Sequence, residues 1–79
     1  MSTIDINSFV SNFASAFEGS SYPFAPNTRF KEVPEWNSMQ ALYLVGMIDS
    51  EYGIEFNNTD LKSCTTIEDV FVIVQSRLQ

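Results

Sequence analysis

The chain has 79 residues, of which 44% are hydrophobic and seven are phenylalanine, so we expect a single domain, residues 1–79, with one core. A net charge of −6 argues against binding to nucleic acid or to anionic membranes, because phosphate groups repel an acidic surface. The ten acidic residues form no run, and they indicate either a solvated surface or a docking surface for basic partner proteins.

The first predicted element is an amphipathic helix from about residue 4 to residue 17. Its apolar side chains recur at spacings of three and four residues, which is the period of one helix face. Gly19 is expected to end the helix, since glycine readily adopts the left-handed conformation found after many helices. The apolar face consists of Ile6, Phe9, Val10, Phe13 and Phe17.

A long irregular segment follows, from Glu18 to Trp36. Its three prolines, Pro23, Pro26 and Pro34, prevent a long helix. A loop of this length is unusual inside a small domain, so we expect it to be functional or to be pinned to the core by its own apolar residues. The residues available for this are Tyr22, Phe24, Phe30, Val33 and Trp36.

A second helix is predicted to begin around Ser38 and to end near Gly53. Asn37 is a favourable N-cap, and Gln40 stands three residues later, where its side chain can reach back to complete a capping box. The face predicted to meet the core contains Ala41, Leu44, Val45, Ile48 and Tyr52.

The other side of this helix is unusually apolar. Surface helices normally carry charged residues there. Two interpretations stay open: a partner docks on an exposed apolar patch, or aromatic residues of the preceding loop cover it. The residues on this side are Met39, Leu42, Tyr43 and Gly46.

Two further helices complete the predicted fold. The segment Asn57-Asn58-Thr59-Asp60-Leu61-Lys62 begins with cap residues and is long enough for only a turn or two. A final helix starts at a capping box made either by Thr65 with Glu68 or by Thr66 with Asp69. Its apolar face contains Ile67, Val70, Phe71, Val74 and Leu78.

The last helix contains the run "VFVIV", which is also compatible with a buried strand. The cap before it and the length of the segment favour a helix. The predicted fold is therefore all-α, a small four-helix bundle with three main helices, a short third helix and a long loop between the first and the second.

Few side chains of this sequence suit catalysis. The chain has no histidine, the usual base for a serine or cysteine nucleophile. The neighbouring carboxylates Glu68 and Asp69, and Asp49 and Glu51, do not face each other on a helix. We therefore expect no catalytic residue and no enzymatic activity of the chain itself.

Metal binding and export are not indicated either. Without histidine, the single cysteine, Cys64, makes neither an ordinary zinc site nor an internal disulfide. The segment from residue 57 to residue 60 lacks the glycine and the terminal glutamate of a calcium loop. The N-terminus lacks the basic residues and the apolar run of a secretion signal, and no apolar run approaches the roughly 18 residues of a membrane span. We therefore expect a cytoplasmic protein. We also expect it to have no metal site.

Ser38 occupies a position with a specific electrostatic character. The first turn of a helix has unpaired N–H groups and the positive end of the helix dipole, which stabilise an anion by about 0.3 to 1 kcal/mol. By itself, a serine at such a position is more often a simple cap or first-turn residue.

The sequence from residue 30 to residue 79 resembles the acyl carrier proteins, the phosphopantetheine-bearing carriers of fatty-acid, polyketide and peptide synthesis. Trp36-Asn37-Ser38-Met39 resembles the Asp-Ser-Leu attachment signature of that family. The run "IDSEYGIEF" is similar to the end of its second helix, and "TDLKSCTTIEDVFVIV" to its third helix and the start of its fourth. The first helix and the loop agree in length and pattern only.

The resemblance implies that Ser38, beside the cap residue Asn37, takes a 4'-phosphopantetheine arm from coenzyme A. The thiol of the arm would hold an acyl or aminoacyl group as a thioester, so Cys64 is expected to be a small core or surface residue. The implied partners of this monomer are a phosphopantetheinyl transferase and acyl-loading, condensing or transferring enzymes. The expected docking residues are Met39, Leu42, Tyr43, Asp49 and Glu51.

Two positions depart from the family pattern. Asn37 replaces the usual Asp and removes a negative charge that is associated with the magnesium site of the transferase, which implies slower modification or a dedicated transferase. Gln40, Tyr43 and Gly46 stand where the family commonly carries acids, so docking should use the apolar patch. Asn37 also motivates an alternative, a degenerate carrier fold that acts as an unmodified protein-interaction module.

Overall fold

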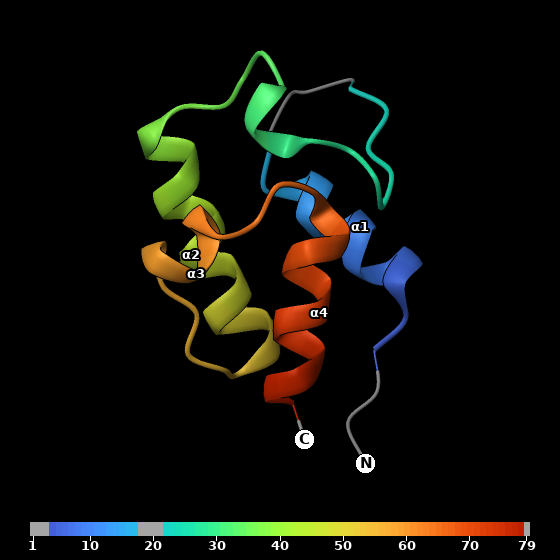
Figure 1. Cartoon of the computed structure of the whole chain (residues 1–79), viewed down its shortest axis with the longest axis vertical. Helices are drawn as coiled ribbons and strands as arrows, with labels where there is room; N and C mark the ends of the chain where they lie inside the picture. Colours follow the sequence, from blue (N-terminus) through green and yellow to red (C-terminus); the bar gives the residue numbers. More distant parts are fainter. Residues whose placement is uncertain (1–3, 18–21, 79) are drawn as a thin grey trace.

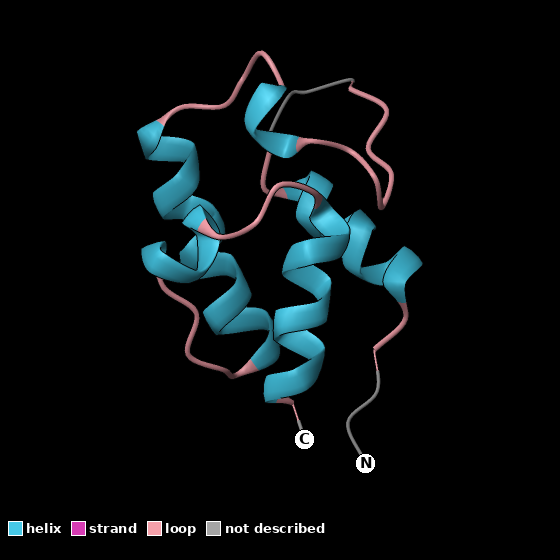
Figure 2. Ribbon diagram, viewed as in Figure 1, coloured by secondary structure: helices cyan, strands magenta, loops and turns pink. Residues whose placement is uncertain are grey.

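The structure is a computed structural model that describes residues 4–17 and 22–78. Within these ranges it is all-helical and has no β-strand, which confirms the predicted four-helix bundle with its short third helix (Figure 2). The elements are α1 (Ile6–Ser15), the short 3₁₀ helix η1 (Phe30–Glu32), α2 (Ser38–Tyr52), α3 (Asn58–Lys62) and α4 (Ile67–Arg77), as Figure 1 shows.

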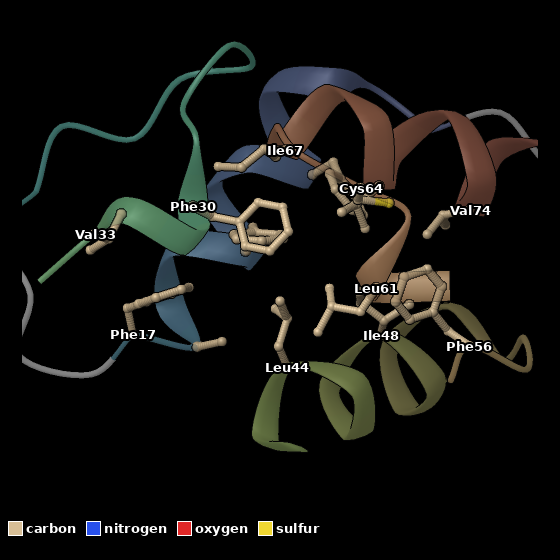
Figure 3. Close-up of a cluster of buried hydrophobic side chains, with 14 of the residues drawn as sticks. Phe17, Phe30, Val33, Leu44, Ile48, Phe56, Leu61, Cys64, Ile67 and Val74 are labelled. Carbon is tan, nitrogen blue, oxygen red and sulfur yellow. The ribbon is translucent and has the colours of Figure 1, made fainter. Parts of the chain in front are cut away.

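The four α-helices surround one core. Helix α1 packs against α4, and the short α3 packs against both α2 and α4 (Figure 1). Figure 3 shows side chains from α2, α3, α4 and the long loop meeting in this core. The most deeply buried of the large side chains are Phe9, Phe13, Phe17, Phe30, Leu44, Ile48, Ile67, Val70 and Val74.

Helix α1 is shorter than its apolar pattern predicts. It starts after Asp5, whose carboxylate accepts a hydrogen bond from the Ser8 N–H at 3.1 Å. It ends at Ser15, because the N–H groups of Ala16 and Phe17 bond three residues back instead of four. Phe17 nevertheless stays buried. The expected role of Gly19 lies outside the described residues.

The long loop is pinned by its own apolar residues, as predicted. Phe30 and Val33 are buried, and Phe24 and Trp36 pack against the core. The exception is Tyr22, which stays 40% exposed and contacts the Phe24 ring with a centroid distance of 5.4 Å.

The same loop also caps the last helix. The carbonyl oxygens of Pro26 and Thr28 accept hydrogen bonds from the N–H groups of Glu68 and Ile67 at 2.8 Å and 3.1 Å. These donors lie in the first turn of α4, where no carbonyl within the helix can pair with them. The loop is therefore part of the bundle.

The helix ends follow the predicted caps. Thr66 and Asp69 form the capping box of α4, and Asn57 and Asp60 form that of α3. Helix α2 ends at Gly53, whose φ of 62° places it in the left-handed region that favours glycine. The "VFVIV" run is helical, so the strand alternative is excluded.

Candidate functional site

Ser38 is the first residue of α2 and is exposed to solvent. The Asn37 side chain caps the helix, because its Oδ1 accepts a hydrogen bond from the Gln40 N–H at 2.8 Å. Among the described residues, the Ser38 hydroxyl has no hydrogen-bond partner. The hydroxyl is therefore accessible from solvent.

The predicted capping box at this helix is only half formed. The Gln40 side chain does not return to Asn37; its Nε2 donates to the Ala16 carbonyl at 2.6 Å. This carbonyl lies at the C-terminal end of α1, where carbonyls lack partners within the helix. Gln40 therefore connects the start of α2 to the end of α1. Gln40 and Ala16 are 24 positions apart, so the sequence pattern around Gln40 does not predict this contact.

Trp36 fixes the approach of the chain to Ser38. Its ring stacks on Phe17 at a centroid distance of 6.1 Å and meets Phe30 edge-on at 5.2 Å. The backbone N–H of Trp36 donates to the Val33 carbonyl at 2.9 Å. Ser38 is thus preceded by a tryptophan that packs on the aromatic core and by the N-cap residue of α2.

A groove of about 360 Å³ opens directly beside Ser38. Trp36 and Ala41 line it on the α2 side, and Leu61 lines it on the α3 side. Two basic residues, Lys31 and Lys62, also line it. The groove therefore combines apolar walls with positive charge.

The outer face of α2 carries the apolar patch that the sequence predicted. Met39, Leu42 and Tyr43 are 75%, 63% and 52% exposed, so the loop aromatics do not cover them. Phe30 is buried in the core and Phe24 packs on Phe17. We call the three residues Met39, Leu42 and Tyr43 the α2 patch.

The α2 patch borders a second, larger groove of about 570 Å³. This groove continues along the helix past Gly46, which has no side chain to fill it, to Glu51. Asp49 and Glu51 are exposed. All five predicted docking residues therefore lie on α2 and are accessible, and the patch and Glu51 share one groove.

Cys64 is a buried residue of the core. Its side chain is 2% exposed, and its thiol donates to the Asp60 carbonyl at an Sγ–O distance of 3.3 Å. Burial raises the pKa of the Cys64 thiol above its ordinary value of 9.0, which keeps it protonated at neutral pH.

Neither metal ligands nor a membrane span is found in the part of the chain that the structure describes. Over residues 4–17 and 22–78, no three histidine, cysteine, aspartate or glutamate side chains are placed to hold a metal ion. In the same ranges, every helix is too short or too polar to cross a bilayer.

Comparison with known proteins identifies the fold. No protein-family model and no curated protein matches the sequence. The structure is similar to the solution NMR structure of a holo acyl carrier protein from Geobacter metallireducens, with a TM-score of 0.76 and 19% sequence identity. The match covers 92% of this chain and 84% of that one. The chain therefore has the fold of an acyl carrier protein.

Proposed function

We propose that the chain is a single carrier domain whose Ser38 bears a 4'-phosphopantetheine arm transferred from coenzyme A. One observation carries the proposal: in the fold of an acyl carrier protein, an exposed serine without a hydrogen-bond partner among the described residues starts α2. When bound, the arm supplies a thiol that holds an acyl or aminoacyl group as a thioester.

The residues around Ser38 fit such an arm. The Ser38 hydroxyl is accessible, and the groove between α2 and α3 begins beside Ser38. A phosphodiester on Ser38 would lie at the positive end of α2, where an anion is favoured. The chain itself would hold and orient the arm, while partner enzymes carry out the reactions on the carried group.

The partners are a phosphopantetheinyl transferase and enzymes that load, condense or transfer the carried group. We place their docking site on the α2 patch, with Asp49 and Glu51 as acidic contacts farther along the helix. Hydrophobic contacts at the centre of an interface usually contribute most of its binding energy. The carrier would act as a monomer in the cytoplasm, where a single buried cysteine stays reduced.

Intact-protein mass measurement after incubation with coenzyme A and a phosphopantetheinyl transferase tests the proposal. We expect one added arm on the wild-type chain and none on Ser38→Ala. Ser11→Ala is the matched control, because Ser11 is also an exposed helical serine but lies on α1, and this variant should accept the arm. Failure of the wild-type chain to gain the arm, or an arm that persists in Ser38→Ala, refutes the assignment.

The alternative, an unmodified interaction module with the carrier fold, is favoured by Asn37. This residue keeps the cap but lacks the carboxylate that the family pattern has at this position. If the wild-type chain stays unmodified and Asn37→Asp gains the arm, the alternative is supported. Efficient modification of both proteins rejects it.

A further inference from the structure

Both lysines of the chain line the groove at Ser38. Lys31 belongs to η1 and Lys62 ends α3, so the two come from elements that are distant in sequence. The chain has only four basic side chains among ten acidic ones. Half of the basic side chains of an acidic protein thus line the groove where the arm would be attached.

In the part of the chain that the structure describes, the other two basic residues, unlike the lysines, are paired with carboxylates. Arg77 forms a two-pronged ion pair with Asp60, with N–O distances of 2.6 Å and 2.9 Å, and Arg29 lies 3.7 Å from Glu32. In residues 4–17 and 22–78, neither lysine has a carboxylate partner within 4.0 Å. The two basic residues without a carboxylate partner there are therefore those beside Ser38.

The position of the Lys31 ammonium is set by contacts that leave it able to bind an anion. Its Nζ donates to the Lys62 carbonyl at 3.2 Å and lies 5.8 Å from the centre of the Phe30 ring. An ammonium group has three donors, so two remain for a ligand. The hydrogen bond also joins η1 to the end of α3, which brings the two lysine positions together.

We propose that Lys31 and Lys62 bind the phosphodiester of the arm on Ser38. This inference rests on the proposed function and goes further, because it assigns two cationic ligands to the singly charged phosphate. Trp36, Ala41 and Leu61 line the same groove with apolar surface, which lowers the local dielectric and strengthens the attraction. The lysines would hold the base of the arm along the groove between α2 and α3.

A comparison of melting temperatures with and without the arm tests this proposal. The measured quantity is the Tm of the modified protein minus the Tm of the unmodified protein, for wild type, Lys31→Gln, Lys62→Gln and the double variant. Any direct effect of a substitution on the fold, including loss of the Lys31 hydrogen bond, occurs in both forms and cancels. Arg29→Gln is the matched control, since Arg29 is an exposed basic residue outside the groove.

We expect this temperature difference to be lower by about 2 to 5 °C in the double variant than in wild type. It should be unchanged in Arg29→Gln, and 1 M salt should reduce the wild-type value toward that of the double variant, because salt screens exposed charges. The ³¹P NMR resonance of the phosphodiester should also move in the double variant.

Equal temperature differences and equal ³¹P resonances in all modified variants would overturn the proposal. That result would leave the lysines as solvated residues or as contacts for an acidic partner protein. Mass measurement separates this failure from a failure of the proposed function. If the wild-type chain takes no arm at all, both proposals are rejected together.

Discussion

At the scale of single residues, the position before Ser38 decides how α2 begins. Asn37 supplies a neutral oxygen that pairs with the Gln40 N–H at 2.8 Å, and its extended backbone precedes the first helical residue. This cap satisfies one of the four N–H groups that a helix start leaves unpaired. It also fixes the backbone on which the Ser38 hydroxyl is presented.

Substitution of Asn37 separates the cap from the charge. Asn37→Ala should lower the free energy of unfolding by about 1 kcal/mol, because the Gln40 N–H loses its acceptor. Asn37→Asp should keep the cap and raise this free energy by about 0.3 to 1 kcal/mol, since a negative charge is favourable at a helix start. Urea denaturation at low ionic strength measures both. An Asn37→Ala variant as stable as wild type would show that the cap contributes nothing.

At the scale of helices, the two faces of α2 differ in burial. Leu44 and Ile48 are fully buried on its inner face, while the α2 patch is exposed on its outer face. The inner face packs into the common core, and α3 is one of its neighbours there. In the described part of the chain, no element covers the outer face, which is the basis for placing partner docking there.

Leu42→Ser tests docking on the outer face. Because Leu42 is 63% exposed, the substitution should change the Tm little, yet it should lower kcat/KM for modification of Ser38 about tenfold if the transferase docks there. Val72→Ser is the control, since Val72 is a similarly exposed apolar residue on α4. Equal loss of rate in both variants would argue against a docking site on α2.

Helix α3 is short and depends on one carboxylate. Asp60 accepts from the Asn57 N–H at 3.1 Å and pairs with the Arg77 guanidinium of α4. Arg77 also donates to the Glu55 carbonyl at 3.0 Å. These contacts attach α3, one wall of the groove at Ser38, to the end of α4.

The stability of the protein should depend on pH through Asp60. The hydrogen bond from Arg77 and the bond from the Asn57 backbone lower the pKa of Asp60 below its ordinary value of 3.8. A lowered pKa in the folded state gives stability that is present above pH 3.8 and is lost as the pH falls through the folded pKa. Asp60→Asn should therefore have a lower urea midpoint than wild type at pH 7.

The difference between Asp60→Asn and wild type should shrink as the pH is lowered below 3.8, when the wild-type carboxylate also becomes neutral. Midpoints measured from pH 7 to pH 2.5 by circular dichroism test this. Glu35→Gln is a suitable control, because Glu35 is exposed and its carboxylate has no hydrogen-bond or ion-pair partner among the described residues. A gap of the same size at every pH would contradict the assigned role of Asp60.

At the scale of the whole molecule, aromatic rings connect the core to the candidate site. Phe71 of α4 meets Phe9 of α1 at 5.5 Å between ring centres, and Phe13 meets Phe30 of η1 at 5.3 Å. Phe30 in turn contacts Trp36, the residue two positions before Ser38. The position of Ser38 therefore depends on packing across the whole bundle.

Cys64 provides a probe of this packing. Its thiol is buried and its pKa is raised, so iodoacetamide at pH 8 should label the native protein at least about a hundredfold more slowly than the protein in 8 M urea. Quantitative mass measurement over time checks this. Labelling of the native chain at the unfolded rate would show that the end of α3 opens without global unfolding.

The sequence by itself determined the four α-helices and the cap residues at the starts of α2, α3 and α4. Apolar side chains at helical spacing predict α1, α2 and α4, and the cap residues Asn37, Asn57 and Thr66 mark helix starts, because these signals act within about four residues. Because Asn37 is the N-cap, Ser38 is the first residue of α2.

Only the tertiary structure decided what these elements bring together. The Gln40 side chain bonds to the Ala16 carbonyl, 24 residues away, and not to the cap residue Asn37. The α2 patch stays exposed. Lys31 and Lys62 line the groove beside Ser38. These outcomes depend on which surfaces compete for burial and for unpaired backbone groups once the helices pack. Periodicity within one helix holds no information about that competition.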